Sequence, residues 1–171
     1  KDVTAEVTVG SPVTVACPSN QIIGTDSNSC TASYVINNPV DLPAANKLWK
    51  YVLSGATSDS ATNISSLNNS NAINLPIGTT TITLTGESGS CVPATCSYTV
   101  TVVDDVAPAI TCPATASLNV NQSACTADAG LLGTPVVTDN CSALTPTNDV
   151  SGNFAVGNHT VTWTVADASG N

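Results

Sequence analysis

Hydrophobic and polar residues alternate along much of the chain, which is the pattern of half-buried β-strands. The period of two is clear over residues 81–85, 98–103 and 160–165, where threonine separates larger apolar residues. Threonine and valine are β-branched and suit a pleated strand better than a helix. Glycine, asparagine, proline and aspartate, which favour turns, separate these runs. The pattern therefore predicts an all-β protein.

One segment, residues 42–53, also fits a helix, because a proline lies near its start and a glycine follows it. Trp49, Tyr51 and Leu53 nevertheless recur with a period of two in this segment. That period favours a strand, and we expect one here.

Two parts of the chain repeat each other. Cys17 and Cys30 recur 95 positions later as Cys112 and Cys125, with the same proline and Thr-Ala residues after them. A block over 75–85 also recurs, at a shorter offset, so the first repeat has the longer middle section. Repeated strand patterns of this size predict two small immunoglobulin-like β-sandwiches in tandem.

The repeat also sets the predicted domain boundaries. The first sandwich spans residues 11–105 and ends with a strand over 96–103, whereas the second spans 106–171 and lacks an equivalent last strand. Residues 1–10 alternate apolar and polar side chains, so we expect an extra leading strand there. It would be the last strand of a preceding unit or a strand donated to another copy.

Charged residues are few and mostly acidic. Three lysines oppose twelve acidic residues, which gives a net charge of -9. Without a basic patch, the chain has no means of releasing counterions from a nucleic acid or of binding an anionic lipid surface. No apolar run reaches the roughly 18 residues that a membrane span needs. We expect no nucleic-acid partner and no membrane-embedded segment.

The sequence contains no arrangement typical of an enzyme. His159 is the only histidine, and neither a nucleophile elbow nor a phosphate-binding glycine motif is present. The two glutamates, Glu6 and Glu87, have no second carboxylate near them in sequence for glycoside hydrolysis. We therefore predict no catalytic activity and no organic cofactor.

The seven cysteines include no CxxC pair, which argues against a zinc site. Their number indicates disulfides in an oxidising compartment outside the cytoplasm. Because seven is odd, at least one cysteine has no partner within the chain.

Four aspartates are candidate calcium ligands. Asp104 and Asp105 lie in the linker between the repeats, and Asp139 and Asp167 end the strand blocks of the second repeat. Calcium prefers several hard oxygen ligands around one point, which a junction between sandwiches could gather. The alternative is that these aspartates cap backbone amides in ordinary turns.

Three further residues are candidates for surface contact or modification. Trp49 and Tyr51 could form an aromatic strip for a glycan or protein ligand, although a tryptophan on a central strand is more commonly part of the core. Ser60 lies in an Asp-Ser-Ala triplet, which matches a bacterial O-glycan acceptor pattern.

Several blocks resemble hyalin repeat (HYR) modules, which are immunoglobulin-like sandwiches found in arrays in secreted and surface proteins. The matching blocks cover 109–113, 137–142 and 156–171, and residues 95–100 resemble the last strand of the family. The first repeat departs from the pattern, because it lacks the Asp-Asn-Cys block. Its middle section, residues 49–57, is similar to a bacterial variant of the family.

The resemblance implies a disulfide pattern. It pairs cysteines within each repeat, as Cys17–Cys30, Cys91–Cys96 and Cys112–Cys125. Cys141 would then pair with a cysteine outside this chain, on the missing last strand.

Three functions are compatible with these features. The favoured one is a structural or adhesive module of a long repetitive protein at the cell surface, with neighbouring repeats as partners. The second is a filament subunit whose identical copies join head to tail by β-strand donation. The donor residues 1–10 hold no cysteine for Cys141, which counts against it. The third and weakest is an accessory domain of a secreted hydrolase.

Overall fold

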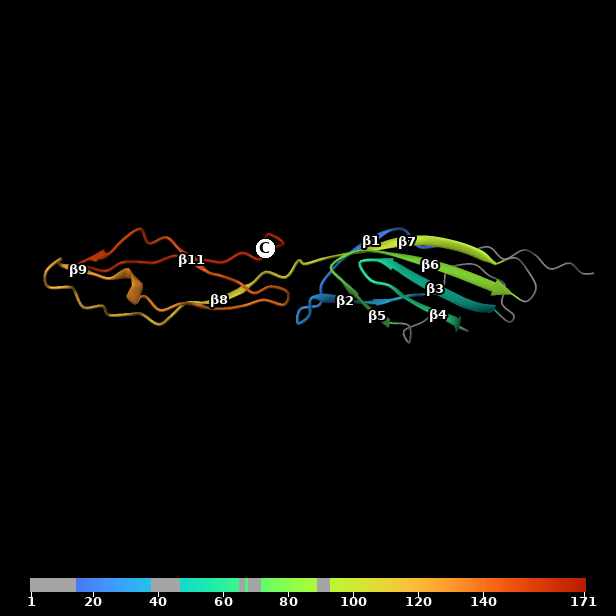
Figure 1. The fold of residues 1–171 in the computed structure, drawn as a ribbon, viewed down its shortest axis with the longest axis horizontal. Coiled ribbons are helices and arrows are strands. Elements are labelled where there is room, and N and C mark those ends of the chain that lie inside the picture. Colours follow the sequence, from blue (N-terminus) through green and yellow to red (C-terminus); the bar gives the residue numbers. More distant parts are fainter. Residues whose placement is uncertain (1–14, 38–46, 65–66, 68–71, 89–92) are drawn as a thin grey trace, which may run out of the picture. The chain divides into compact units, whose positions relative to one another are not determined.

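The computed structural model describes residues 15–37, 47–64, 67, 72–88 and 93–171. The described chain is all-β, as predicted, and carries one short 3-10 helix. It divides into two compact units, shown in Figure 1 and described separately below. Unit 1 comprises Lys1–Ile23 and Thr31–Val103, and unit 2 comprises Gly24–Cys30 and Asp104–Asn171. The predicted leading strand, residues 1–10, lies outside the described residues.

Unit 1 is built from a five-stranded sheet and a strand pair. The strands of the sheet follow the order β1-β7-β6-β3-β4, and β2 pairs with β5. The β2–β5, β3–β4, β3–β6 and β6–β7 pairings are antiparallel. The strand bounds are Gln21–Gly24 (β1), Thr31–Val35 (β2), Lys47–Gly55 (β3), Asp59–Ile64 (β4), Ala72–Pro76 (β5), Gly78–Ser88 (β6) and Ala94–Val103 (β7).

The core of unit 1 comes from the alternating residues of these strands. Tyr51 on β3 lies opposite Leu84 on β6, and Ile82 lies opposite Tyr98 on β7, so every second side chain faces the same side. Buried residues from both layers join one cluster, which contains Ala32, Ile36, Trp49, Tyr51, Leu53, Leu67, Leu75, Ile82, Leu84, Tyr98, Val100 and Val102.

The segment with two interpretations forms a strand where it is described. β3 starts at Lys47, and Trp49 and Tyr51 are only 5% and 7% exposed. Both side chains pack in the core, because they lie on the face of β3 that points into it. Both residues therefore belong to the core, the placement that the sequence favoured, and not to an exposed aromatic strip for a glycan or protein ligand.

A disulfide links the first described residues of unit 1 to the last strand of its sheet. Cys17 is bonded to Cys96 on β7, with 5.6 Å between the Cα atoms. Both cysteines pack against the core cluster. The pairings Cys17–Cys30 and Cys91–Cys96, which the resemblance implied, are wrong. Cys91 itself lies outside the described residues.

Unit 2 has only short strand pairs. β8 (Ala109–Thr111) pairs with β10 (Val136–Thr138), and the remaining pairs have two residues a strand. The other elements are β9 (Thr126–Ala127) with β12 (Phe154–Ala155), β11 (Thr147–Asn148) with β13 (Trp163–Thr164), and the 3-10 helix η2 (Ala129–Leu131).

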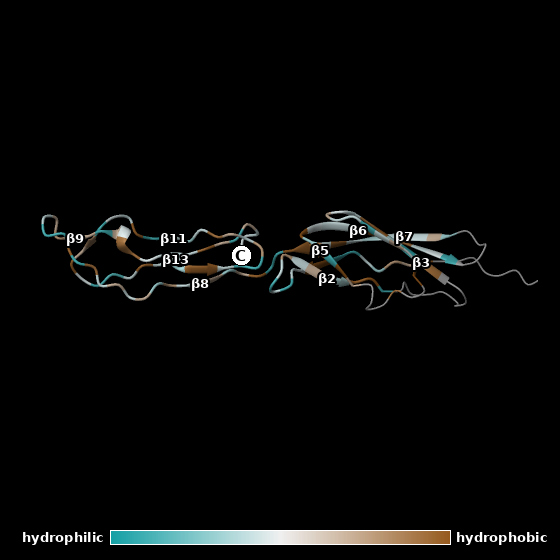
Figure 2. Ribbon diagram, turned by 60° about the horizontal axis from the view of Figure 1, so that its bottom comes forward, coloured by the Kyte–Doolittle hydropathy of each residue, from teal (hydrophilic) through white to brown (hydrophobic). Residues whose placement is uncertain are grey.

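Unit 2 also buries few side chains. Its buried residues are Thr25, Asp104, Ala127, Pro135 and Asp167, of which three are polar or charged. Hydrophobic residues occur there in short stretches between hydrophilic ones (Figure 2). Burial of hydrocarbon, which stabilises unit 1, therefore contributes little to unit 2.

None of the described segments is a helix with the length and hydropathy required to cross a membrane.

We predict that unit 1 loses stability at alkaline pH through Tyr98. This side chain is 3% exposed, and burial together with a 3.3 Å hydrogen bond to the Tyr34 hydroxyl raises its pKa well above the ordinary value. Because the pKa of Tyr98 is raised in the folded state, its contribution to the free energy of unfolding is complete below the unfolded pKa of about 10. That contribution is lost as the pH rises further. Burial also raises the pKa of Tyr51, so the phenolate absorbance of both buried tyrosines should appear together with unfolding.

Tyr98→Phe keeps the ring and removes this ionisation, so its stability should depend less on alkaline pH. Tyr34→Phe removes the same hydrogen bond but leaves Tyr98 buried, and its alkaline dependence should persist. Ionisation of all three tyrosines before unfolding would contradict the prediction.

Candidate metal centre

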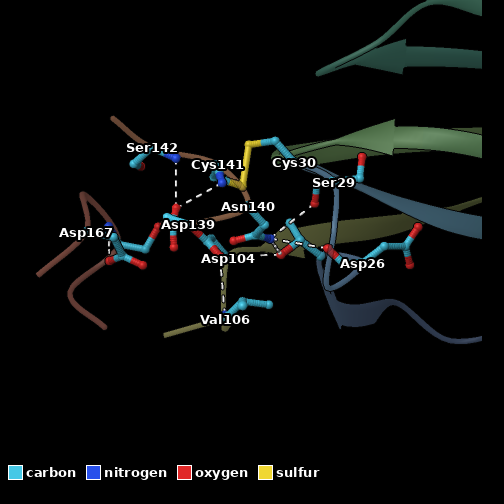
Figure 3. Close-up of a disulfide and its surroundings, with 12 residues drawn as sticks. Asp26, Ser29, Cys30, Asp104, Val106, Asp139, Asn140, Cys141, Ser142 and Asp167 are labelled. Carbon is cyan, nitrogen blue, oxygen red and sulfur yellow. Dashed lines mark hydrogen bonds between the residues drawn. A yellow bond between two sulfur atoms is a disulfide. The ribbon is translucent and has the colours of Figure 1, made fainter. Parts of the chain in front are cut away.

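Three carboxylates of unit 2 meet at one point (Figure 3). Asp104 directly follows β7, Asp139 directly follows β10, and Asp167 lies three residues beyond β13. One oxygen from each side chain lies within 4.8 Å of the others. Asp104 and Asp167 are only 7% and 9% exposed, and Asp139 is half-buried. The cluster therefore joins three segments that are distant in sequence.

Two of these carboxylates are each held by hydrogen bonds to one of their two oxygens. Oδ2 of Asp139 accepts the backbone N–H groups of Cys141 at 2.9 Å and Ser142 at 2.7 Å. Oδ1 of Asp104 accepts the backbone N–H of Val106 at 3.3 Å and the Thr25 hydroxyl at 3.4 Å. Such aspartate turns are local in sequence and hold the carboxylate in one orientation.

Asp167 is held by the turn that follows it. Its Oδ1 accepts the backbone N–H groups of Ser169 at 2.9 Å and Asn171 at 2.8 Å, and its Oδ2 accepts the Asn171 amide at 2.9 Å. The turn passes through Gly170, whose φ of 94° is a conformation that glycine favours. The side-chain hydrogen bond of Asn171, ahead of the backbone ones, lowers the pKa of Asp167. Asp167 is therefore ionised at neutral pH.

The remaining oxygens of the other two aspartates have no partner. Oδ2 of Asp104 and Oδ1 of Asp139 are buried and accept no hydrogen bond, and the same holds for Oδ1 of Asn140. Buried polar atoms without a partner are rare and cost free energy, so each calls for a physical explanation. Here all three atoms are oxygens, and they belong to the cluster or to the residue beside it.

Asn140 connects the cluster to the Gly24–Cys30 segment. Its Nδ2 donates to the Thr25 hydroxyl at 2.9 Å, to the Ser29 carbonyl at 3.1 Å and to the Asp26 carbonyl at 3.3 Å. A disulfide between Cys30 and Cys141, with Cα atoms 4.6 Å apart, closes the same region (Figure 3). The predicted partner of Cys141 outside the chain is therefore wrong.

No basic side chain of unit 2 neutralises the cluster. The sequence of this unit contains no lysine or arginine. Its one histidine, His159, is exposed, contacts the Ala155 carbonyl at 2.9 Å and lies 5.1 Å from the ring of Phe154. Two unit charges 4–5 Å apart repel each other by roughly 3–4 kcal/mol at an effective dielectric constant of 20. No lysine or arginine in the sequence of unit 2 offsets such a repulsion.

Three of the four aspartates predicted as calcium ligands lie together, and their role as ligands stays a prediction. Asp104, Asp139 and Asp167 come together, whereas Asp105 is exposed and its carboxylate lies against Gly24 instead. Asn140 was missed, although it follows a predicted ligand and belongs to the Asp-Asn-Cys block. The predicted boundaries, 11–105 and 106–171, also did not anticipate that Gly24–Cys30 belongs to unit 2.

The other predicted site residues are exposed. Cys112 and Cys125 are both free, so the pairing that the resemblance implied between them is wrong. Ser60 lies exposed on β4, and its modification stays a prediction.

Comparison of the chain with protein-family models, with curated proteins and with solved structures found no match.

We predict that peptide mapping of the unreduced chain will recover two cross-linked pairs, Cys17 with Cys96 and Cys30 with Cys141. Cys112 and Cys125 should react with an alkylating reagent in the native chain, because both are exposed. A peptide that joins Cys17 to Cys30 would contradict the structure.

Replacing Asn140 should destabilise unit 2. Asn140→Ala removes three hydrogen bonds, among them the one to the hydroxyl of the buried Thr25, so we expect a loss of about 1–3 kcal/mol in the free energy of unfolding. Calorimetry of the disulfide-bonded chain measures this loss. Asn148→Ala is the matched control, since the exposed Asn148 accepts a single hydrogen bond from the Val150 N–H. An equal effect of the two substitutions would show that Asn140 has no special role.

Proposed function

We propose that the chain is a non-enzymatic structural or adhesive module, part of a longer repetitive protein at the cell surface. The sequence repeat, the all-β structure and the likeness of both repeats to hyalin repeat modules support this function. The two disulfides fit an oxidising, extracellular environment. The proposed partners are neighbouring repeats, and the proposed architecture is a series of immunoglobulin-like sandwiches.

One observation carries the proposal: a disulfide joins a cysteine of the first sequence repeat to a cysteine of the second. Cys30 belongs to the first repeat, and Cys141 belongs to the Asp-Asn-Cys block of the second. The same chain also bonds Cys17 to Cys96 within the first repeat. Successive repeats are thus linked covalently by one pair and closed individually by the other.

The two free cysteines among the described residues are the repeat equivalents of bonded ones. Cys112 corresponds to Cys17, whose partner lies on a last strand, and Cys125 corresponds to Cys30, whose partner lies in the Asp-Asn-Cys block of the next repeat. We infer that Cys112 pairs with a cysteine on a strand like β7 and that Cys125 pairs with a further Asp-Asn-Cys block. Both free thiols are then positions at which an array continues.

A second function, assembly of identical copies by β-strand donation, is favoured by the strand pairing of unit 2. β6 of unit 1 pairs with β3 on one side and β7 on the other, whereas its repeat equivalent β13 pairs only with β11. Unit 2 also exposes large apolar side chains, among them Leu131, Val136 and Val156 at 61%, 66% and 77%. A strand added to an unpaired edge could cover such residues. Residues 1–10, the proposed donor, lack a cysteine for Cys112.

The array proposal predicts the behaviour of a chain extended after Asn171 by a second copy of residues 95–103. The added strand carries a copy of Cys96, which should form a disulfide with Cys112. Cys112 should then no longer react with an alkylating reagent in the native chain, whereas Cys125 should still react. A version whose added cysteine is replaced by serine is the matched control, and it should retain reactive Cys112 and Cys125.

Reactivity of Cys112 in the extended chain would contradict the equivalence of the repeats. Strand donation gives a different result with the unextended chain. It should assemble at high concentration, and the copy of residues 95–103 should abolish assembly because it fills the same edge. A monomeric unextended chain in sedimentation experiments favours the array.

A further inference from the structure

We propose that unit 2 binds one calcium ion on the carboxylates of Asp104, Asp139 and Asp167. This proposal concerns the chain by itself and does not depend on whether the chain forms part of an array. It rests on the buried oxygens without partners, on the distances within the cluster, and on the absence of lysine and arginine from the unit's sequence.

The distances suit a single oxygen-coordinated ion. Calcium binds oxygens at about 2.3–2.6 Å, so two ligands on opposite sides of the ion lie roughly 4.6–5.2 Å apart. All three carboxylates of the cluster offer an oxygen within 4.8 Å of the others. Magnesium binds at about 2.0–2.1 Å with strict octahedral geometry and would require a tighter cluster. Zinc prefers sulfur and nitrogen ligands, and the cluster offers only oxygen.

The two unpartnered oxygens have the arrangement of ligand atoms held ready for an ion. Asp104 is more than nine-tenths buried, its Oδ1 is hydrogen-bonded, and its Oδ2 is buried without a partner. Asp139 likewise has one hydrogen-bonded oxygen and one without a partner: Oδ2 accepts two backbone N–H groups, and Oδ1 accepts none. Turn caps alone would explain the bonded oxygens but not the burial of the other two. A cation bound to them would satisfy both oxygens and their charge.

Asn140 offers a fourth oxygen. Its Nδ2 donates to the Thr25 hydroxyl, which in turn donates to Asp104, so the amide lies one hydroxyl group away from the cluster. Its Oδ1 is buried and has no partner. Amide oxygens are ordinary calcium ligands, and water commonly supplies the rest of the six to eight. We therefore include Asn140 as a neutral ligand.

The ion would act as a cross-link. Asp104 lies at the start of the main segment of unit 2, Asp139 is two residues from the Cys30–Cys141 disulfide, and Asp167 belongs to the turn over 167–171. One ion would hold these three segments together where few apolar side chains do so. Removal of calcium should thus loosen unit 2 and leave unit 1 folded.

The test uses the full disulfide-bonded chain and calcium alone as the ligand. Equilibrium dialysis should find one ion per chain, with a dissociation constant of about 10⁻⁴–10⁻³ M, as in extracellular calcium modules. At saturating calcium the melting temperature of unit 2 should rise by about 5–10 °C relative to chelator. Magnesium at the same concentration should give a clearly smaller rise.

Asp104→Asn and Asp139→Asn are the decisive variants, because each keeps the shape and removes one charge. Each should bind calcium at least about tenfold more weakly. In chelator each should melt at or above the wild-type temperature, because one repulsive charge is gone. Asp128→Asn is the matched control: Asp128 is exposed and its Oδ1 accepts the Gly130 N–H at 2.8 Å in the same kind of turn. It should leave calcium binding unchanged.

Absence of bound calcium in the wild-type chain would overturn the proposal, as would Asp104→Asn and Asp139→Asn variants that bind it like the wild type. If one variant does not fold, the other and the dialysis of the wild-type chain still decide the question. Equal binding of magnesium and calcium would overturn the assignment to calcium.

Discussion

The structure of unit 2 depends on how its buried carboxylates are compensated. Asp104 and Asp167 are among the few buried residues of the unit, and Asp139 lies against them. Charges removed from water cost several kcal/mol each unless hydrogen bonds or opposite charges replace the solvent. Backbone amides and the Asn171 side chain satisfy one side of the cluster. The sequence of the unit has no lysine or arginine to compensate the other side. A calcium ion bound there would neutralise the remaining carboxylate charge.

The two units reach a stable fold by different means, although their sequences repeat. In unit 1 the longer strands bury a contiguous apolar cluster, and β6 has hydrogen-bonded neighbours along both edges. The repeat equivalent of Asp167 there is Ser88, and the first repeat has no Asp-Asn-Cys block, so the same carboxylate cluster has no counterpart. A large apolar core makes such a cluster unnecessary. In unit 2 the polar cluster and a disulfide hold segments that short strand pairs leave loosely connected.

Sequence patterns predicted the local features of this chain better than its long-range pairings. The period of two identified the strands and placed Trp49 in a strand, because alternation follows directly from the geometry of the pleat. The three aspartates that meet in unit 2 were also singled out, since Asp139 and Asp167 end recognisable strand blocks. Disulfide partners and the role of Asn140 depend on segments that are far apart in sequence. A local sequence pattern does not show which distant segments meet in the fold, and the resemblance to other modules implied the wrong cysteine pairing.

The long-range disulfides are also the energetically more useful ones. Cys17–Cys96 and Cys30–Cys141 span 79 and 111 residues, whereas the pairings that the resemblance implied, such as Cys17–Cys30, would close much shorter loops. On the chain-entropy model a loop of about 100 residues stabilises the fold by about 4.7 kcal/mol, against about 3 kcal/mol for a loop of about 15 residues. The gain matters most for Cys30–Cys141, because unit 2 buries little hydrocarbon. The same bond fixes Cys141 next to Asp139, so the covalent cross-link and the carboxylate cluster reinforce one another.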